Sequence, residues 1–227
     1  MSGPRGTHAL ILADGTVASA AELDDAWPGW SDGIDLVIAA DGGARHAGAL
    51  GRRIDLWVGD GDSFGEAAVE ALERDGIAVR RAAVDKDESD TELAVLAALD
   101  ANAARITILG ALGGRRLDHG LANIWLLDHP RLIDHDVRLI DASCRIRLAG
   151  PGRIDIAGRV GDVVSLFPFG GTASGIVTDG LRYALRDEDL TSGPSRGLSN
   201  VRTAGDARLT VRSGRILVVE TPATLSE

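Results

Sequence analysis

The sequence predicts a mostly parallel α/β domain followed by an antiparallel β-sandwich, with a barrel as the alternative for the second part. Up to about residue 140, short apolar runs alternate with helical repeats, the pattern of a parallel sheet covered on both faces. From about residue 150, short runs are separated by turn residues, and no repeat of helical length occurs. The segment AGPG at 149–152 marks the change, so we expect domains at 1–148 and 149–227.

The individual elements follow from the spacing of the apolar residues. In the first part, short apolar runs predict strands at 8–15, 35–43, 56–63, 76–84, 105–112 and 136–143. Apolar residues at helical spacing predict helices at 65–76, 90–103 and 117–129. In the second part, runs bounded by turn residues predict strands at 152–158, 162–171, 174–180, 181–185, 197–206, 207–214 and 215–220.

Composition limits the class of protein and its partners. With 44% hydrophobic residues, the 227-residue chain has enough apolar side chains for a core. Its apolar runs are far shorter than the about 18 residues of a membrane span, and its N-terminus lacks a signal-peptide core, so we expect a cytoplasmic protein without a membrane partner. A net charge of -10 argues against nucleic acid as a partner, because that affinity depends on many Lys and Arg side chains.

Acidic and glycine residues follow several of the predicted strands. Asp41, Gly42 and Gly43 end one strand, and Asp60 and Asp62 end the next. The carboxyl ends of parallel strands form the ligand crevice of an open sheet, so these groups are expected to converge. If the strand continues through Asp60 and Asp62, both side chains face the same way. Carboxylates beside a substrate phosphate suit Mg²⁺.

The segment DKDESD at 85–90 adds further acids around Lys86, the only lysine of the chain. Asp87 and Asp90 are candidates to complete the metal site, and Lys86 offers a compact positive charge to phosphate oxygens. A structural alternative remains open at this stage, because Ser89 and Glu92 have the spacing of a capping box and Asp41 and Asp60–Asp62 also fit ordinary turns after strands.

The segment GALGGRRLDHGLAN at 110–123 suggests a phosphate seat. Gly110, Gly113 and Gly114 can expose backbone N–H groups at a helix start, with Arg115 or Arg116 as a forked donor. In the structural alternative, Asp118 caps the helix and His119 pairs with Asn123. A P-loop nucleotide site is excluded because the Gly-Lys-Ser/Thr signature is missing, a dinucleotide fold is disfavoured, and His and Cys are too sparse for a convincing nucleophilic triad.

Taken in order, ADGGARH, GDGDS, DKDESDTELA, GALGGRRLDHGLAN and the late GLSN resemble the thiamine pyrophosphokinase family. The resemblance implies an N-terminal α/β domain and a C-terminal β-sandwich. It also implies a Mg²⁺-dependent transfer of pyrophosphate from ATP to the hydroxyl of thiamine, with AMP as the second product. It further implies a homodimer whose thiamine pockets are shared between the α/β domain of one subunit and the sandwich of the other.

The resemblance also assigns roles to residues. Asp60, Asp62 and one or both of Asp87 and Asp90 would hold Mg²⁺ and polyphosphate. The nucleotide and phosphates would contact Asp41, Gly42, Gly43, Lys86, Gly113, Arg115, Arg116 and His119. Thiamine would contact Asp90, Asp118, Ser199 and Asn200, and in the family pattern the last two belong to the sandwich of the other subunit.

This chain departs from the family pattern at several positions. Gly61 stands where many relatives carry an aromatic residue, and Ser89 where threonine is usual. GGRRLDH has one arginine more than the common pattern, which leaves both Arg115 and Arg116 as candidates, and Val201 stands where Glu or Trp is common. The alternatives to a pyrophosphokinase are a non-catalytic thiamine or nucleotide sensor and a transferase acting on a different alcohol.

Overall fold

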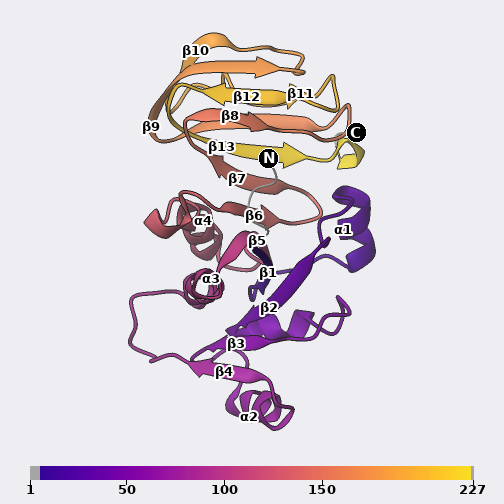
Figure 1. Ribbon diagram of the computed structural model, residues 1–227, viewed down its shortest axis with the longest axis vertical. Helices are drawn as coiled ribbons and strands as arrows, with labels where there is room; N and C mark the ends of the chain where they lie inside the picture. The colour runs from indigo at the N-terminus through magenta and orange to yellow at the C-terminus, as the bar shows by residue number, and fades with distance from the viewer. Residues whose placement is uncertain (1–5, 226–227) are drawn as a thin grey trace. The chain divides into compact units, whose positions relative to one another are not determined.

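The computed structural model describes residues 6–225, and the chain divides into two compact units, Met1–Ala142 and Ser143–Glu227. Figure 1 shows the helices in the first unit and long antiparallel strands in the second. The division falls ahead of the boundary expected at 149–152. The difference is strand β7 (Arg145–Ala149), which the sequence analysis did not recognise and which pairs with β13 of the second unit.

The first unit is a parallel sheet with the strand order β4-β3-β2-β1-β5-β6. Its strands are β1 (Thr7–Leu12), β2 (Ile34–Ala40), β3 (Leu56–Gly59), β4 (Ala78–Arg81), β5 (Ala103–Leu109) and β6 (Asp136–Ile140). Every strand predicted for this unit is confirmed. The central strands read as continuous apolar runs because helices or loops cover both of their faces.

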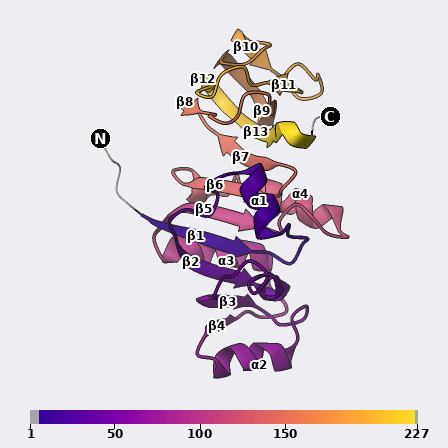
Figure 2. The ribbon, with the colours of Figure 1, turned by 90° about the vertical axis from the view of Figure 1, so that its right-hand side faces the viewer.

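Helices cover the two faces of this sheet, as Figure 2 shows for α1 and α3. The predicted helices are α2 (Glu66–Arg74), α3 (Asp90–Asp100) and α4 (Leu117–Leu126), and all are confirmed. Helix α1 (Ala20–Ala26) was not predicted, although Ser19 and Glu22 form a complete capping box at its start. Its short length leaves few apolar positions from which to read a period.

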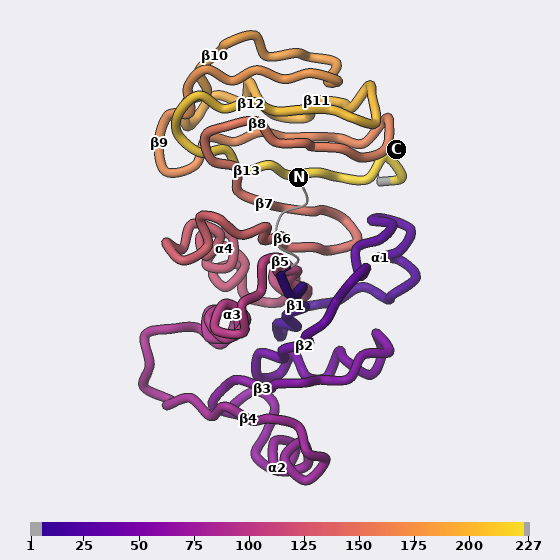
Figure 3. Tube along the Cα trace, viewed as in Figure 1, coloured from indigo at the N-terminus to yellow at the C-terminus, as the bar shows by residue number. Residues whose placement is uncertain are grey.

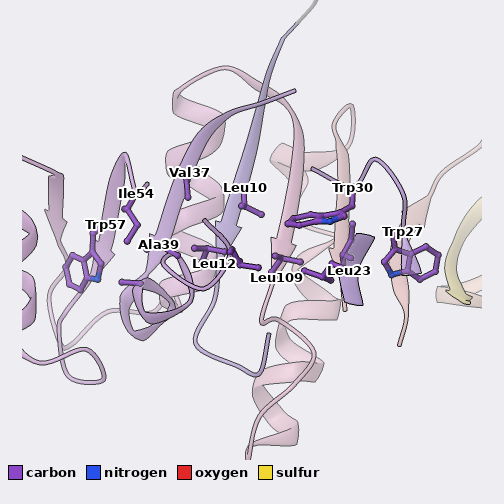
Figure 4. Close-up of a cluster of buried hydrophobic side chains, with 14 of the residues drawn as sticks. Leu10, Leu12, Leu23, Trp27, Trp30, Val37, Ala39, Ile54, Trp57 and Leu109 are labelled. Carbon is purple, nitrogen blue, oxygen red and sulfur yellow. The ribbon is translucent and has the colours of Figure 1, made fainter. Parts of the chain in front are cut away.

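One hydrophobic cluster lies between α1, the loop after it and one face of the sheet (Figure 4). Leu10 and Leu12 of β1 and Val37 and Ala39 of β2 point to this face, because alternate residues of a strand share a side. The cluster also contains Leu23, Trp27, Trp30, Ile54, Trp57 and Leu109. The cluster therefore reaches from α1 to β3, the strand that leads into Asp60 and Asp62.

The second unit is antiparallel and is organised by β9 (Val163–Asp179). The first half of β9 pairs with β13 (Ser213–Thr221) and β11 (Asn200–Val201), and its second half with β10 (Arg186–Leu190) and β12 (Arg208–Val211). Strand β8 (Gly152–Asp155) pairs with β12. Gly170, Gly171 and Gly175 have positive φ values, which only glycine adopts readily, so β9 can turn from one set of partners to the other.

The core of the second unit lies between these two sets of strands and includes Val164, Leu166, Ile176, Leu209 and Val218. The fold class predicted from the sequence, a parallel sheet domain followed by antiparallel strands, is confirmed. Short 3₁₀ turns complete the described chain, at η1 (Asp41–His46), η2 (Pro130–Leu132) and η3 (Ala223–Leu225).

The strand predicted at 181–185 is wrong. Leu181 forms only an isolated bridge with Arg202, and the regular strand is β10, which begins at Arg186. The N–H groups of Arg182 and Tyr183 donate to Val201 O and to the side chain of Asn200, so they do not join a ladder along β9. Leu181 and Leu185 are apolar because they enter the core at the ends of a loop.

A buried ion network lies inside the second unit. Arg202 is completely buried and donates to Glu220 Oε1 at 2.7 Å, to Asp162 Oδ2 at 3.0 Å and to the carbonyl of Ile156. Arg145 donates to both carboxylate oxygens of Glu220, at 2.8 and 2.9 Å. Burial alone would raise the pKa of Glu220, but Arg145 and its neighbouring arginines hold the pKa below its usual value.

We predict that Glu220→Gln lowers the free energy of unfolding by about 3–5 kcal/mol, because it leaves Arg202 buried without its nearest opposite charge. Since the folded pKa of Glu220 lies below the unfolded value, its stabilisation is present above about pH 4.5 and is lost as the pH falls through the folded pKa. The difference between the two proteins in urea unfolding therefore shrinks on acidification.

Glu188→Gln is the matched control. Glu188 also accepts two hydrogen bonds from one arginine, Arg196, at 2.9 Å each, but both side chains are exposed. Its substitution is expected to cost much less than that of Glu220, because solvent screens an exposed ion pair. Equal losses in the two variants would contradict the importance of the buried network.

Candidate active site

The candidate site is built where β1, β2, β3 and β5 end. Strand β2 runs directly into η1, whose first residue, Asp41, is buried and has a φ of 41°. A Cβ atom on Gly42 would lie 2.1 Å from Asp14 Oδ1, and one on Gly43 would lie 2.0 Å from Leu12 O. These glycines are therefore needed because η1 crosses the end of β1 in close contact.

Asp41 is held from three directions. Its carboxylate accepts hydrogen bonds from the N–H groups of Ser63, at 2.9 Å, and Phe64, at 3.4 Å. Its carbonyl accepts a hydrogen bond from Trp57 Nε1 at 3.0 Å. Burial raises the pKa of Asp41, although the bond from Ser63 opposes the rise. The side chain is thus fixed by main chain from the loop after β3.

Asp60 and Asp62 lie in a turn and not in a continued strand, because β3 ends at Gly59. Gly61 has a φ of 83°, and the N–H of Asp62 donates to Asp60 Oδ1 at 3.1 Å. The turn brings the two side chains together with Asp41. One carboxylate oxygen from each of Asp41, Asp60 and Asp62 lies within 4.8 Å of the others.

This group of three residues is called the carboxylate cluster below. Its donor atoms are all hard oxygens, the ligand type that Mg²⁺ prefers, so the residues present fit such an ion. The sequence analysis expected Asp60 and Asp62 at the metal but placed Asp41 at the nucleotide. The sequence showed that Asp41 lies at the end of a strand. It did not show the left-handed backbone of Asp41, which directs the side chain toward the loop after β3.

Lys86 lies between two carboxylates. Its Nζ atom is 2.7 Å from Asp60 Oδ2 and 3.0 Å from Asp90 Oδ1, and its side chain is 13% exposed. The bond from Lys86 lowers the pKa of Asp60, whereas burial raises the pKa of Asp90. Burial would lower the pKa of Lys86, but its bonds to Asp60 and Asp90 together raise it. Lys86 therefore stays charged beside the carboxylate cluster.

The other acids of DKDESD lie elsewhere. Asp85, Asp87 and Glu88 are exposed in the loop between β4 and α3, which Figure 3 shows running from the edge strand to the helix. Ser89 caps α3, because its Oγ atom accepts from the N–H of Glu92 at 3.2 Å. The capping interpretation of Ser89 is therefore confirmed. Asp90 is the acid of this segment that reaches the site, through Lys86.

The glycines after β5 pack against the loop after β1. The N–H of Gly15 donates to Gly110 O at 3.0 Å, and a Cβ atom on Gly15 would lie 2.1 Å from Gly113 O. A Cβ atom on Gly113 would lie 2.8 Å from Thr16 Cβ. Gly113 thus allows two strand-end loops to touch. Gly114, the next residue, is exposed.

The start of α4 differs from the structural alternative. Asp118 does not cap the helix, and Arg116 donates to both of its carboxylate oxygens, which lowers the pKa of Asp118. Asn123 is buried and donates to Ala111 O at 2.9 Å, so the pair with His119 in that alternative is wrong. Arg115 and His119 are exposed, and Arg115 forms no ion pair within residues 6–225.

Two charged residues of the site were missed by the sequence analysis. Arg45 donates to Asp14 Oδ1 at 2.9 Å and to the carbonyl of Ser63, and its guanidinium lies 5.7 Å from the ring centre of Phe64. Arg45 therefore connects the loops after β1, β2 and β3. The signal was present in the sequence, because Asp14 lies at the end of a predicted strand, as Asp41 does.

In the second unit, Ser199 and Asn200 have different surroundings. Ser199 is exposed and has a φ of 53°, and its N–H donates to Ser165 Oγ at 3.0 Å. Asn200 is buried, accepts from the N–H groups of Tyr183 and Val201, and donates to Tyr183 O at 2.8 Å. Asn200 thus holds the loop that carries Tyr183 through two hydrogen bonds to the Tyr183 backbone.

Comparison with known proteins agrees with this geometry. The model of the thiamin pyrophosphokinase catalytic domain matches residues 30–140, and the model of the thiamin pyrophosphokinase vitamin B1 binding domain matches residues 153–216. The chain belongs to the thiamin pyrophosphokinase family. The first match covers Asp41, Asp60, Asp62, Lys86 and Asp90, and the second covers Ser199 and Asn200. The resemblance seen in the sequence is therefore confirmed.

Individual members of this family are similar over different lengths. The thiamine pyrophosphokinase of Bacillus subtilis (strain 168) is 32% identical over 143 residues, which span 63% of this chain and 66% of the relative, just under two thirds. The crystal structure of a Bacillus subtilis thiamine pyrophosphokinase superposes with a TM-score of 0.82 at 26% identity, covering 95% of this chain and 99% of that one.

More distant family members share the fold. A thiamin pyrophosphokinase family protein from Enterococcus faecalis superposes with a TM-score of 0.78 at 25% identity, over 95% of this chain and 98% of that one. The yeast enzyme superposes with a TM-score of 0.77 at 15% identity, over 98% of this chain and 88% of that one. Within the described residues, no helix is both long and apolar enough to span a membrane.

We predict that Asp62→Asn weakens Mn²⁺ binding about tenfold or more, because one oxygen ligand of the carboxylate cluster loses its charge. Asp87→Asn is the control, since Asp87 is an exposed acid of the loop after β4. It is expected to leave the Mn²⁺ affinity unchanged. Isothermal titration of the full chain measures both. A larger loss of Mn²⁺ affinity in Asp87→Asn than in Asp62→Asn would indicate that the metal binds in the loop after β4.

Proposed function

We propose that this protein is a thiamine pyrophosphokinase, which transfers a pyrophosphoryl group from ATP to the hydroxyl oxygen of thiamine and releases AMP. The observation that carries the proposal is the carboxylate cluster with Lys86 beside it, at the strand ends of the unit matched by the family's catalytic domain. A cation at the cluster and an ammonium next to it suit a polyphosphate, whose transfer requires positioning and neutralisation of charge.

Asp41, Asp60 and Asp62 are the residues that would hold Mg²⁺. When bound, Mg²⁺ supplies positive charge to the oxygens of the polyphosphate. Asp60 and Asp90 orient Lys86, so that its ammonium is fixed as a point charge at the edge of the cluster. Because Arg116 is engaged by Asp118, Arg115 is the more available phosphate donor of the pair.

The transfer also requires a group that takes the proton of the attacking hydroxyl. A carboxylate with a raised pKa is a better proton acceptor than one with a lowered pKa. Burial raises the pKa of Asp41 and of Asp90, whereas Lys86 lowers that of Asp60. Asp41 is proposed to bind Mg²⁺, whose positive charge would oppose its protonation, so these surroundings favour Asp90 over Asp60 for this step.

The second unit is proposed to bind thiamine, since the model of the vitamin B1 binding domain matches it. Ser199 is exposed and is the candidate contact, while Asn200 acts by holding the loop of Tyr183 in place. An acidic site also suits the positive charge of the thiazolium ring. We further propose that the reaction takes place in the cytoplasm, where ATP is available.

The proposed reaction is tested by incubating the protein with ATP, Mg²⁺ and thiamine and identifying the products by chromatography. We expect AMP and thiamine diphosphate in equal amounts, and a loss of at least about a hundredfold in rate for Asp62→Asn, as for other charge-stabilising groups. ADP as the product would indicate monophosphoryl transfer. Binding of thiamine without turnover would favour a sensor, and turnover of another alcohol alone would favour a related transferase.

We also propose a homodimer with shared active sites, as the family resemblance implies. Mixing Asp62→Asn with Ser199→Trp tests it, because the two changes lie in different units. If the units of two subunits form each site, random dimers contain intact sites and the mixture recovers about a quarter of the wild-type rate. Each variant alone stays inactive. No recovery in a mixture that light scattering shows to be dimeric would contradict shared sites.

A further inference from the structure

A buried tryptophan donates a hydrogen bond to the backbone of the carboxylate cluster. Trp57 lies on β3 and is completely buried, and its only polar side-chain atom, Nε1, donates to Asp41 O at 3.0 Å. Cβ atoms built on Gly59 and Gly61 would lie 3.1 and 4.0 Å from its ring. The side chain of Trp57 thus binds the turn that carries Asp41, and its ring lies where a side chain at position 59 would be in tight contact with it.

Asp41 needs such support because its backbone is in the left-handed region. A φ of 41° is unfavourable for a residue with a Cβ atom and persists only where the surroundings hold it. The N–H groups of Ser63 and Phe64 hold the carboxylate, but nothing in those two bonds fixes the carbonyl. The indole of Trp57 supplies that contact from inside the core.

We propose that Trp57 is a positioning residue for the metal site: its indole N–H holds the backbone of Asp41 so that the carboxylates of Asp41, Asp60 and Asp62 meet at one cation. The proposal rests on the metal-binding part of the proposed function and is independent of which alcohol or nucleotide reacts. It gives a specific use to the indole N–H of a side chain that lies within a hydrophobic cluster.

The competing explanation is that Trp57 only fills space. Figure 4 shows it at the end of the hydrophobic cluster near Ile54 and Ala39, and an indole is a large contribution to any core. The two explanations differ in what the N–H does. A space-filling role needs the ring alone, whereas positioning needs the hydrogen bond to Asp41 O.

Trp57→Phe separates them, because phenylalanine keeps an aromatic ring but has no N–H. We expect the Mn²⁺ affinity of the full chain, measured by isothermal titration without nucleotide, to fall by about tenfold or more, as for other groups that orient metal ligands. Circular dichroism and a cooperative urea transition establish that the variant is folded. An unchanged Mn²⁺ affinity in the folded variant would overturn the proposal.

Trp27→Phe is the matched control. Trp27 is also buried, belongs to the same cluster, and donates from Nε1 to a main-chain carbonyl, that of Asp141, at 2.7 Å. Its substitution is expected to lower stability without changing the Mn²⁺ affinity. If Trp27→Phe weakened Mn²⁺ binding as much as Trp57→Phe, the effect would be one of general stability and the proposal would fail.

A second variant covers the case in which Trp57→Phe does not fold. Gly59→Ala places a Cβ atom 2.8 Å from Asp41 Cβ and 3.1 Å from Trp57 Cζ2, so it shifts the two residues that the hydrogen bond joins. We expect it also to weaken Mn²⁺ binding about tenfold. Full affinity in folded Gly59→Ala would count against the proposal.

The outcome is distinguishable from failure of the proposed function. A wild-type protein that binds Mn²⁺ but forms no AMP would refute the reaction and leave the role of Trp57 intact. A wild-type protein that forms AMP, with Trp57→Phe binding Mn²⁺ normally, would refute the role of Trp57 alone. If the wild type binds no Mn²⁺, there is no site to position and the inference is refuted.

Discussion

Like charges held close together are the constraint on which the first unit depends. One oxygen from each of three carboxylates lies within 4.8 Å of the others, and the repulsion between the carboxylates must be offset. Lys86 offsets part of it at Asp60, and main-chain N–H groups of Ser63 and Phe64 offset part of it at Asp41. The acidic segment at 85–90 thus contributes to the site despite the net charge of -10, because it contains Lys86, the only lysine of the chain, which lies beside Asp60.

The fold supplies the convergence that this chemistry needs. Parallel strands end at one edge, so residues far apart in the chain, such as Asp41 and Asp60, arrive together. Close approach of the strand-end loops depends on positions without side chains, above all Gly42 and Gly43, where a Cβ atom would collide with Asp14 or the end of β1. The hydrophobic cluster beneath supports the same edge, since it extends to Trp57 on β3.

Much of the fold was predictable because buried parallel strands and amphipathic helices leave a clear period in the sequence. Helix α1 was missed because it is short, and 181–185 was misassigned because Leu181 and Leu185 anchor a loop in the core. At the site, the sequence predicted that acidic residues at the strand ends form a metal site. The convergence of Asp41 with Asp60 and Asp62 at one edge was also predicted. The place of Asp41 at the metal, and the support from Trp57, depend on backbone angles and long-range hydrogen bonds, which no spacing in the sequence reports.

The central claim is that Asp41, Asp60 and Asp62 bind one divalent ion together. Anomalous diffraction from crystals grown with Mn²⁺ tests it most directly, because the signal locates the ion without reference to activity. The account predicts a peak about 2.0–2.3 Å from one carboxylate oxygen of each of the three residues. A peak coordinated by Asp87 and Glu88 without Asp41, or the absence of any peak at the three residues, would contradict the account.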